Sequence, residues 1–134
     1  MKKNNSFFLF HLNLAFSSIE NSLHEEVINK CYFPLLEKFS KNDIKLGIEV
    51  SGWTLTKINE LSPKWVSIFK ELLSQNKCEL IASGYSQIIG PLVPYEVNIK
   101  NHEIGLDINK EILDVIPETV LVNEMSYSNG VAEV

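Results

Sequence analysis

Four short apolar runs, separated by longer segments with helical spacing, constrain the fold of this chain more than any other feature. The runs are Phe7–Phe16, Ile44–Val50, Cys78–Ala82 and Thr119–Val122. They recur at intervals of roughly 30 to 40 residues, which is the spacing of βαβ units. They are largely apolar without clean alternation, as is typical of parallel strands covered on both faces. The pattern predicts an α/β fold with a parallel sheet.

The first segment between the runs has apolar residues spaced by three and four over residues 23–39. Ser22 and Glu25 match the S-x-x-E capping box at its start. Pro34 lies inside the pattern and should kink or shift the helix, because proline cannot donate the helical hydrogen bond.

The later segments carry clearer boundaries. Residues 53–61 predict a short helix, and Ser62 with Pro63 predicts the start of another, with serine at the N-cap and proline at the first helical position. A long helix is expected from near Pro94 to Pro117, weakened slightly by Gly105.

The opening run, FFLFHLNLAF, follows Lys2 and Lys3 and therefore invites comparison with a secretory signal. His11 and Asn13 interrupt its apolar character, and Phe16 stands where a cleavage site requires small residues. We therefore expect a buried strand in a cytoplasmic protein. No apolar run approaches the roughly 18 residues of a membrane span, and no membrane partner is expected.

Composition narrows the partners of the chain. Its 134 residues suit one small domain or a piece of a larger one. The net charge is −5 and arginine is absent, whereas nucleic-acid binders usually present a clustered basic face with arginine forks. Nucleic acid is therefore not an expected partner. Cys31 and Cys78 belong to no metal-binding spacing and are expected to be reduced core residues.

Polar and aromatic residues follow the predicted strands, where parallel α/β folds place their functional groups. They are His11, Asn13, Glu49, Trp53, Tyr85, Gln87, Asn123 and Glu124. Carboxylates, amides and aromatic faces are what a sugar site uses for hydroxyl groups, stacking and an oxocarbenium-like transition state. His24-Glu25 and His102-Glu103 lack the second histidine of HExxH, and no GxGxxG or Walker loop occurs, so no metal or other cofactor is expected.

Each of these residues also has a purely structural interpretation. His11 could be a satisfied core histidine, Glu49 could cap a helix or pair with a lysine, and Trp53 could belong to the core. Glu124 is the hardest to explain this way, because a carboxylate directly after a buried strand needs a partner or a function. His24 and His102 lie on charged helical patterns and are expected to be solvated.

Four motifs in register carry a resemblance to a known family. They are FHLNLAFSSIE, IEVSGWTLTKINEL, CELIASGYSQIIGPLVPYEV and TVLVNEMSYS. In this order and spacing they resemble the N-terminal part of glycoside hydrolase family 57, from about Phe7 to Tyr127. The resemblance implies about four βα units of an irregular (β/α)7 barrel, with residues 1–134 forming a partial catalytic domain that is truncated at its C-terminal end.

The resemblance also implies an activity and roles for individual residues. Members act on α-glucans and related sugars with retention and without a metal, so an oligo- or polysaccharide substrate is expected. Glu124 corresponds to the nucleophilic glutamate, and His11 to the histidine that lines the sugar subsite. The segment Gly84 to Gln87 matches the second motif, and Asn13, Glu49, Trp53 and Tyr85 complete the expected substrate site.

Two departures from the family pattern concern the first and second motifs. The first usually continues His-Gln-Pro, whereas His11 is followed by Leu12-Asn13, and the second commonly ends in histidine where Gln87 stands. The acid/base aspartate lies in a later motif, and Asp107 and Asp114 fall on helical patterns away from the strand ends. A retaining glycosidase needs two carboxyl groups roughly 5 to 5.5 Å apart. We therefore expect this chain alone to be inactive.

Two other functions stay open from sequence. The chain could be a truncated or decayed fragment that binds sugar weakly without catalysis. It could also be a relative of the polysaccharide deacetylases, although no HxxxH metal pair is present. The oligomeric state, the sugar and its linkage are not predicted.

Overall fold

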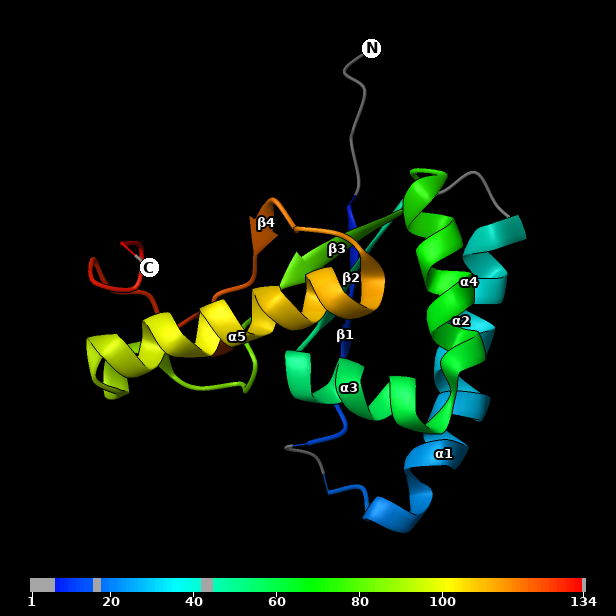
Figure 1. Ribbon diagram of the computed structural model, residues 1–134, viewed down its shortest axis with the longest axis horizontal. Helices are drawn as coiled ribbons and strands as arrows, with labels where there is room; N and C mark the ends of the chain where they lie inside the picture. The colour runs from blue at the N-terminus through cyan, green and yellow to red at the C-terminus, as the bar shows by residue number, and fades with distance from the viewer. Residues whose placement is uncertain (1–6, 16–17, 42–44, 134) are drawn as a thin grey trace.

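The sheet that organises the chain is seen in a computed structural model, which describes residues 7–15, 18–41 and 45–133. Its four strands are β1 (Phe8–Leu12), β2 (Leu46–Val50), β3 (Cys78–Ala82) and β4 (Thr119–Val120). All are parallel and lie in the order β1-β2-β3-β4, so each strand pairs with the one before it in the chain (Figure 1). The predicted α/β fold with parallel strands, as part of a barrel, is confirmed.

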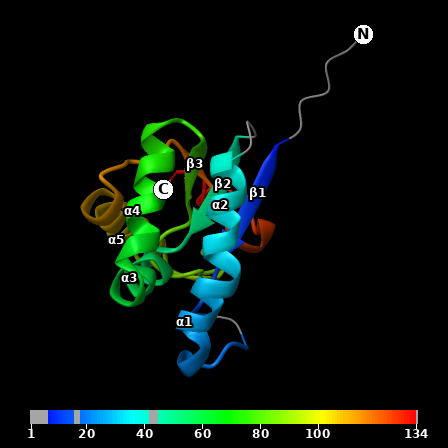
Figure 2. The ribbon, with the colours of Figure 1, turned by 90° about the vertical axis from the view of Figure 1, so that its right-hand side faces the viewer.

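Helices connect the strands and cover the sheet. Their bounds are η1 (Asn21–Leu23), α1 (His24–Val27), η2 (Ile28–Tyr32), α2 (Phe33–Lys41), α3 (Gly52–Leu61), α4 (Pro63–Ser74), η3 (Gly90–Leu92), α5 (Tyr95–Leu113) and η4 (Asn123–Met125). Helices α2 and α4 lie side by side along the sheet, and α3 lies at the C-terminal ends of the strands against α5 (Figures 1 and 2). Within the described residues, none of the helices has the length and apolar character needed to cross a membrane.

The first helical segment differs from its prediction at the start. The chain enters through η1, a 3-10 turn, and no side chain caps η1 or α1, so the capping box predicted from Ser22 and Glu25 is wrong.

The predicted effect of Pro34 is confirmed in a specific form. Residues 28–32 form a π-helical turn just before Pro34, which lies in the first turn of α2. A π turn absorbs the missing proline N–H without ending the helix.

Helices α4 and α5 begin where the sequence predicts. Pro63 opens α4 with Ser62 at the N-cap, although the cap bond runs from the Trp65 N–H to the backbone oxygen of Ser62, at 2.9 Å. The buried face of α5 is the unexpected feature. It consists of Asn98, Asn101, Gly105, Asn109 and Leu113. Ile104, Ile108 and Ile112 of this helix are only partly buried, because α5 packs against backbone as well as side chains.

The core lies between the sheet and helices α2, α3 and α4. All five residues of β2 are buried, and Trp65 and Phe69 of α4 are fully buried with ring centroids 5.0 Å apart. Cys78 is buried as expected, whereas the prediction for Cys31 is wrong, since it is exposed on the outer face of η2.

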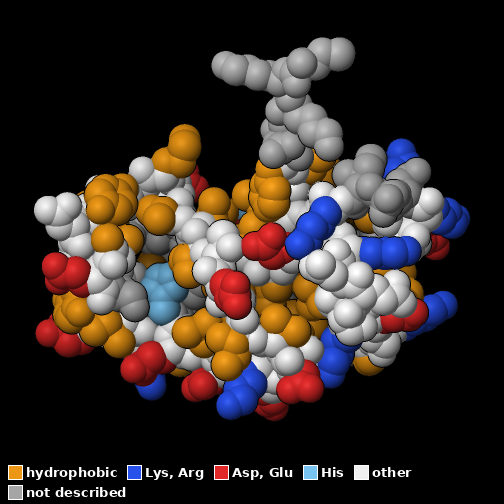
Figure 3. All heavy atoms as spheres, turned by 90° about the horizontal axis from the view of Figure 1, so that it is seen from above, with side chains coloured by type: hydrophobic (Ala, Val, Ile, Leu, Met, Phe, Trp, Pro, Cys, Tyr) orange, Lys and Arg blue, Asp and Glu red, His pale blue; other side chains and the backbone are white. Residues whose placement is uncertain are grey.

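Strand β1 is less buried than its sequence predicts. Phe8, Leu9 and Phe10 are exposed, and only Leu12 of this strand belongs to the core. The cause is position: in the described sheet β1 pairs with β2 alone and forms an edge. Seen from the N-terminal ends of the strands, hydrophobic side chains reach the surface across the middle of the molecule, while lysines gather on one side (Figure 3). An apolar edge of this kind requires cover in a stable assembly.

Two histidines were expected to be solvated. His24 is fully buried, its ring centroid 6.2 Å from that of Trp53 in an edge-on contact, and neither of its nitrogens has a hydrogen-bond partner in the described part of the chain. His102 is half-buried, and burial lowers its pKa. Both expectations are wrong, because α1 and α5 turn these positions inward.

Gly105 gives a direct test of the packing between α5 and the loop after β3. A Cβ added at Gly105 would lie 2.6 Å from the carbonyl carbon of Gly84, in backbone that cannot move aside cheaply. Gly105→Ala should therefore lower the free energy of unfolding by about 1–3 kcal/mol, despite the better helix propensity of alanine. Urea unfolding of the variant and the unmodified chain measures this change in the free energy of unfolding.

Gly130→Ala is the matched control, because nothing lies within 4 Å of a Cβ added there. Equal stability of the two variants would contradict the close approach of α5 to this loop.

Candidate functional site

The centre of the site is a pair formed across two neighbouring strands. His11 of β1 and Glu49 of β2 are register partners, at the C-terminal ends of their strands. Nδ1 of His11 donates to Oε2 of Glu49. The Glu49 carboxylate is 0% exposed, whereas the His11 side chain is 43% exposed. His11 therefore lies on the surface of the site, and Glu49 lies beneath it as its support.

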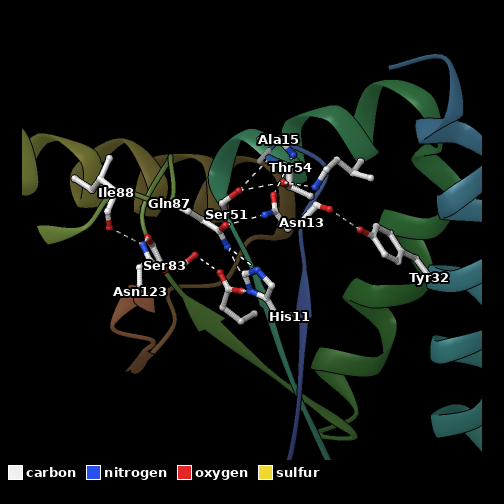
Figure 4. A network of polar contacts seen from close by, with 12 residues as sticks. His11, Asn13, Ala15, Tyr32, Ser51, Thr54, Ser83, Gln87, Ile88 and Asn123 are labelled. Carbon is white, nitrogen blue, oxygen red and sulfur yellow. Dashed lines mark hydrogen bonds and ion pairs between the residues drawn. The ribbon is translucent and has the colours of Figure 1, made fainter. Parts of the chain in front are cut away.

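Ser83 completes the binding of the Glu49 carboxylate. It follows β3 directly, is buried, and its hydroxyl donates to Oε1 of Glu49 (Figure 4). Each carboxylate oxygen thus has its own donor, one from β1 and one from the residue directly after β3. A buried carboxylate is stable only when its oxygens are satisfied in this way.

Asn13 and Gln87 form a second polar layer above the histidine. Nδ2 of Asn13 donates to Oε1 of Gln87 at 2.8 Å, and Oδ1 of Asn13 accepts from the backbone N–H of Ala15 at 3.0 Å. Nε2 of Gln87 lies 2.8 Å from Nε2 of His11 (Figure 4). The two departures from the family motifs therefore contact each other.

The loop that carries Gln87 is fixed by helices α3 and α5. The side-chain amide of Asn101 in α5 accepts from the Ser86 N–H at 2.8 Å and donates to the Ser86 carbonyl at 3.0 Å. It therefore satisfies both backbone groups of Ser86, as a neighbouring strand would do in a sheet. The Gly52 N–H donates to the Gly84 carbonyl at 2.9 Å. Gly84 has φ of 88°, a conformation that suits glycine. The position of Gln87 thus depends on both helices.

Glu124 lies after β4 in unusual backbone. It is exposed, with φ of 54° and ψ of 20°, and Met125 follows with φ of 51°. Two successive non-glycine residues in the left-handed region are rare and costly, which is typical of functional sites. Asn123 anchors the turn, because its Nδ2 donates to the carbonyls of Ser83 and Ile88 at 3.2 and 3.3 Å.

Trp53 and Tyr85, the two aromatic residues expected in the site, are both half-buried. The Trp53 N–H donates to the Tyr85 carbonyl at 3.0 Å, which joins the start of α3 to the loop after β3. The Trp53 ring packs against His24 and the core, so a structural role for this side chain is observed directly.

The electrostatics of the site follow from its carboxylates. The hydrogen bond to Glu49 raises the pKa of His11, burial opposes this, and the charges of Glu49 and then Glu124 raise it further. The smallest of these effects on the pKa comes from Glu124, which belongs to η4 after β4. In the described part of the chain, no group of three or more His, Cys, Asp or Glu side chains is arranged to hold a metal ion.

The structure thus gathers most of the residues selected from sequence. His11, Asn13, Glu49 and Gln87 form one network, and Glu124 acts on it through its charge. Sequence reasoning missed Ser83 and Asn101. The position of Ser83 directly after a strand was an available signal, whereas nothing in a helical pattern distinguishes Asn101 from a solvated asparagine.

Comparison with known proteins decides the family. The family model that is described as Glycosyl hydrolase family 57 matches residues 4–134 of this sequence. The chain belongs to this family. The resemblance read from the four motifs is therefore confirmed.

Individual relatives of family 57 agree with this assignment. A putative alpha-amylase of Methanocaldococcus jannaschii is 25% identical over 123 residues, which cover 88% of this chain and 26% of the relative. An alpha-amylase of Pyrococcus furiosus is 25% identical over 77 residues, which cover 57% of this chain and 12% of the relative. The chain thus spans about a quarter or less of the length of these curated relatives.

Solved structures show the same fold. The 4-alpha-glucanotransferase from Thermococcus litoralis superimposes with a TM-score of 0.82 at 20% identity, covering 95% of this chain and 20% of that one. The alpha-amylase AmyC from Thermotoga maritima superimposes with a TM-score of 0.73 at 16% identity, covering 95% of this chain and 36% of that one.

The variant Glu49→Gln tests whether the hydrogen bond from His11 to Glu49 raises the pKa of His11. The raised pKa of His11 means that its pairing stabilises the fold fully below the pKa of an unfolded histidine, about 6.5, and that this contribution is lost as pH rises through the higher folded pKa. In Glu49→Gln the pKa of His11 should fall and this pH dependence should disappear. NMR titration of the imidazole and urea unfolding at several pH values measure both.

Glu79→Gln is the control, since Glu79 lies on β3 at the other end of the sheet, where it accepts a hydrogen bond from the Thr119 hydroxyl. An unchanged pKa of His11 in Glu49→Gln would contradict the pairing.

Proposed function

We propose that this chain forms part of the catalytic domain of a retaining enzyme that hydrolyses or transfers α-glucan-like saccharides, with Glu124 as its nucleophile. One observation carries the proposal. Glu124 is an exposed carboxylate, held by strained backbone at the C-terminal edge of the sheet, near enough to influence His11. The relatives, which are named alpha-amylase and 4-alpha-glucanotransferase, support α-linked glucose polymers as the substrate class.

The roles of the other residues follow from their positions. His11 is the exposed member of the network and is proposed to bind a sugar hydroxyl, with Asn13 and Gln87 beside it. Glu49 is 0% exposed and bound to His11 and Ser83, so its proposed role changes from sugar contact to positioning of His11. Tyr85 and Trp53, which are both partly exposed, are proposed to pack against the sugar ring.

The proposed reaction needs a second carboxyl group. A retaining mechanism requires a general acid roughly 5 to 5.5 Å from the nucleophile. Of the carboxylates in the described ranges, Glu49 and Glu124 act on His11, and Glu49 is buried with both oxygens bonded. We therefore propose that the acid comes from residues outside this 134-residue sequence, that the sequence is a partial domain, and that alone it does not turn over natural glucan.

An activated sugar separates the nucleophile from the missing acid. With a 2-deoxy-2-fluoro-glucosyl fluoride, a Glu124 oxygen attacks the anomeric carbon and fluoride leaves with the bonding electrons, so no acid is needed. The covalent glycosyl ester on Glu124 should be detected by mass spectrometry of the digested chain. Glu124→Gln should abolish it.

Glu118→Gln is the matched control, because Glu118 is an exposed glutamate just before β4, at the other end of the same strand. Labelling that persists in Glu124→Gln would refute the nucleophile. If the unmodified chain bound maltooligosaccharide without being labelled, the non-catalytic sugar-binding alternative would replace this proposal.

A further inference from the structure

The hydrogen bonds above His11 have a fixed direction. The backbone N–H of Ala15 can only donate, so the atom of Asn13 that it contacts at 3.0 Å is the amide oxygen. The amide nitrogen of Asn13 therefore faces Gln87 and donates to Oε1 at 2.8 Å. This leaves the amide nitrogen of Gln87 directed at His11. One backbone donor thus sets the orientation of both side-chain amides.

The last contact of this series is made with the imidazole ring. Nε2 of Gln87 lies 2.8 Å from Nε2 of His11 and 3.4 Å from Nδ1. These two distances place the amide nitrogen over the ring rather than in line with the Nε2 lone pair. The N–H groups of Gln87, the positive end of its amide dipole, therefore lie against the face of the histidine.

We propose that Asn13 and Gln87 are positioning residues that oppose a second proton on His11 and so favour the form with the proton on Nδ1 and the Nε2 lone pair available to the site. Glu49 selects the Nδ1–H form by accepting from it. The amide of Gln87 disfavours a second proton, because a cationic ring would face the positive end of a dipole. The inference goes beyond the proposed function, since it concerns a protonation state and its test requires no sugar.

The amide pair is needed because the charged groups near His11 act in the opposite sense. In the described part of the chain they are Glu49 from β2 and Glu124 from η4, and both raise its pKa. Without an opposing dipole, the imidazole would bind a second proton more readily. A neutral ring offers a lone pair to a sugar hydroxyl, whereas an imidazolium offers only N–H donors.

The pair cannot adapt simply to a protonated ring. If the Gln87 amide rotated to turn Oε1 toward His11, its nitrogen would face the nitrogen of Asn13, and two donors would meet. Asn13 cannot rotate in response without losing its bond to the Ala15 N–H. Protonation of His11 therefore costs the Asn13–Gln87 hydrogen bond, which couples the three residues.

NMR titration of the histidine-labelled chain tests the inference. The chain has three histidines, and the His11 signal is identified as the one missing from His11→Gln. Gln87→Leu should raise the pKa of His11 by roughly half a unit to one unit, the size expected for one lost polar contact. Leucine shields the ring from water and so would by itself lower the pKa, which makes a rise diagnostic. Gln87→Glu should raise it further.

Asn13→Ala should raise the pKa of His11 as well, because it frees Gln87 to turn its oxygen toward the ring. In the double variant Asn13→Ala/Gln87→Leu, the pKa should equal that of Gln87→Leu alone, since the proposed effect of Asn13 on His11 passes through its hydrogen bond to Gln87. Gln75→Leu is the matched control, because that glutamine pairs with Glu71 at the opposite end of the sheet. It should leave the pKa unchanged.

The results that overturn the inference are equally specific. An unchanged or lowered pKa in Gln87→Leu, or additive shifts in the double variant, would refute it. A purely structural role for the amides would lower stability without moving the pKa. If Gln87→Leu failed to fold, a pKa unchanged in both Asn13→Ala and Gln87→Glu would refute it. The wild-type ¹⁵N shifts must also show Nδ1 protonated and Nε2 unprotonated.

Discussion

The buried carboxylate of Glu49 is the interaction on which the rest of the site depends. A charge at 0% exposure would be prohibitively costly without partners, and it receives one donor from β1 and one from after β3. The pairing therefore ties three strands together at their C-terminal ends and fixes the direction of the His11 ring. The His11–Glu49 hydrogen bond forms only while the strands keep their register, so the fold and the site stabilise each other.

Much of the architecture could be predicted because apolar periodicity and helix boundary signals act locally. Strand β3 and the starts of α4 and α5 lie where the sequence places them. The errors arise where tertiary contacts override local pattern. The exposure of Phe8 to Phe10 depends on which strand is a neighbour, and the burial of His24 depends on the position of Trp53. Neither is encoded in the spacing of nearby residues.

The grouping of the candidate site residues could be predicted, but their contacts with one another could not. Residues that follow parallel strands meet at one edge, so His11, Asn13, Glu49 and Gln87 could be grouped before their contacts were known. That Glu49 lies buried beneath His11 depends on tertiary packing, and that Asn13 meets Gln87 depends on the loop held by Asn101. Such contacts join residues far apart in sequence, and propensity has no information about them.

The strand order has a consequence for how the chain forms during synthesis. Because each strand pairs with its predecessor, no strand has to wait for a distant partner, and the sheet can grow one unit at a time from the N-terminal end. His11, Glu49 and Ser83 can meet as soon as the third strand leaves the ribosome. The turn with Glu124 comes later in the chain, so it can be added to a polar network that is already assembled. Structure formed earlier can then offset the energetic cost of the left-handed backbone at Glu124 and Met125.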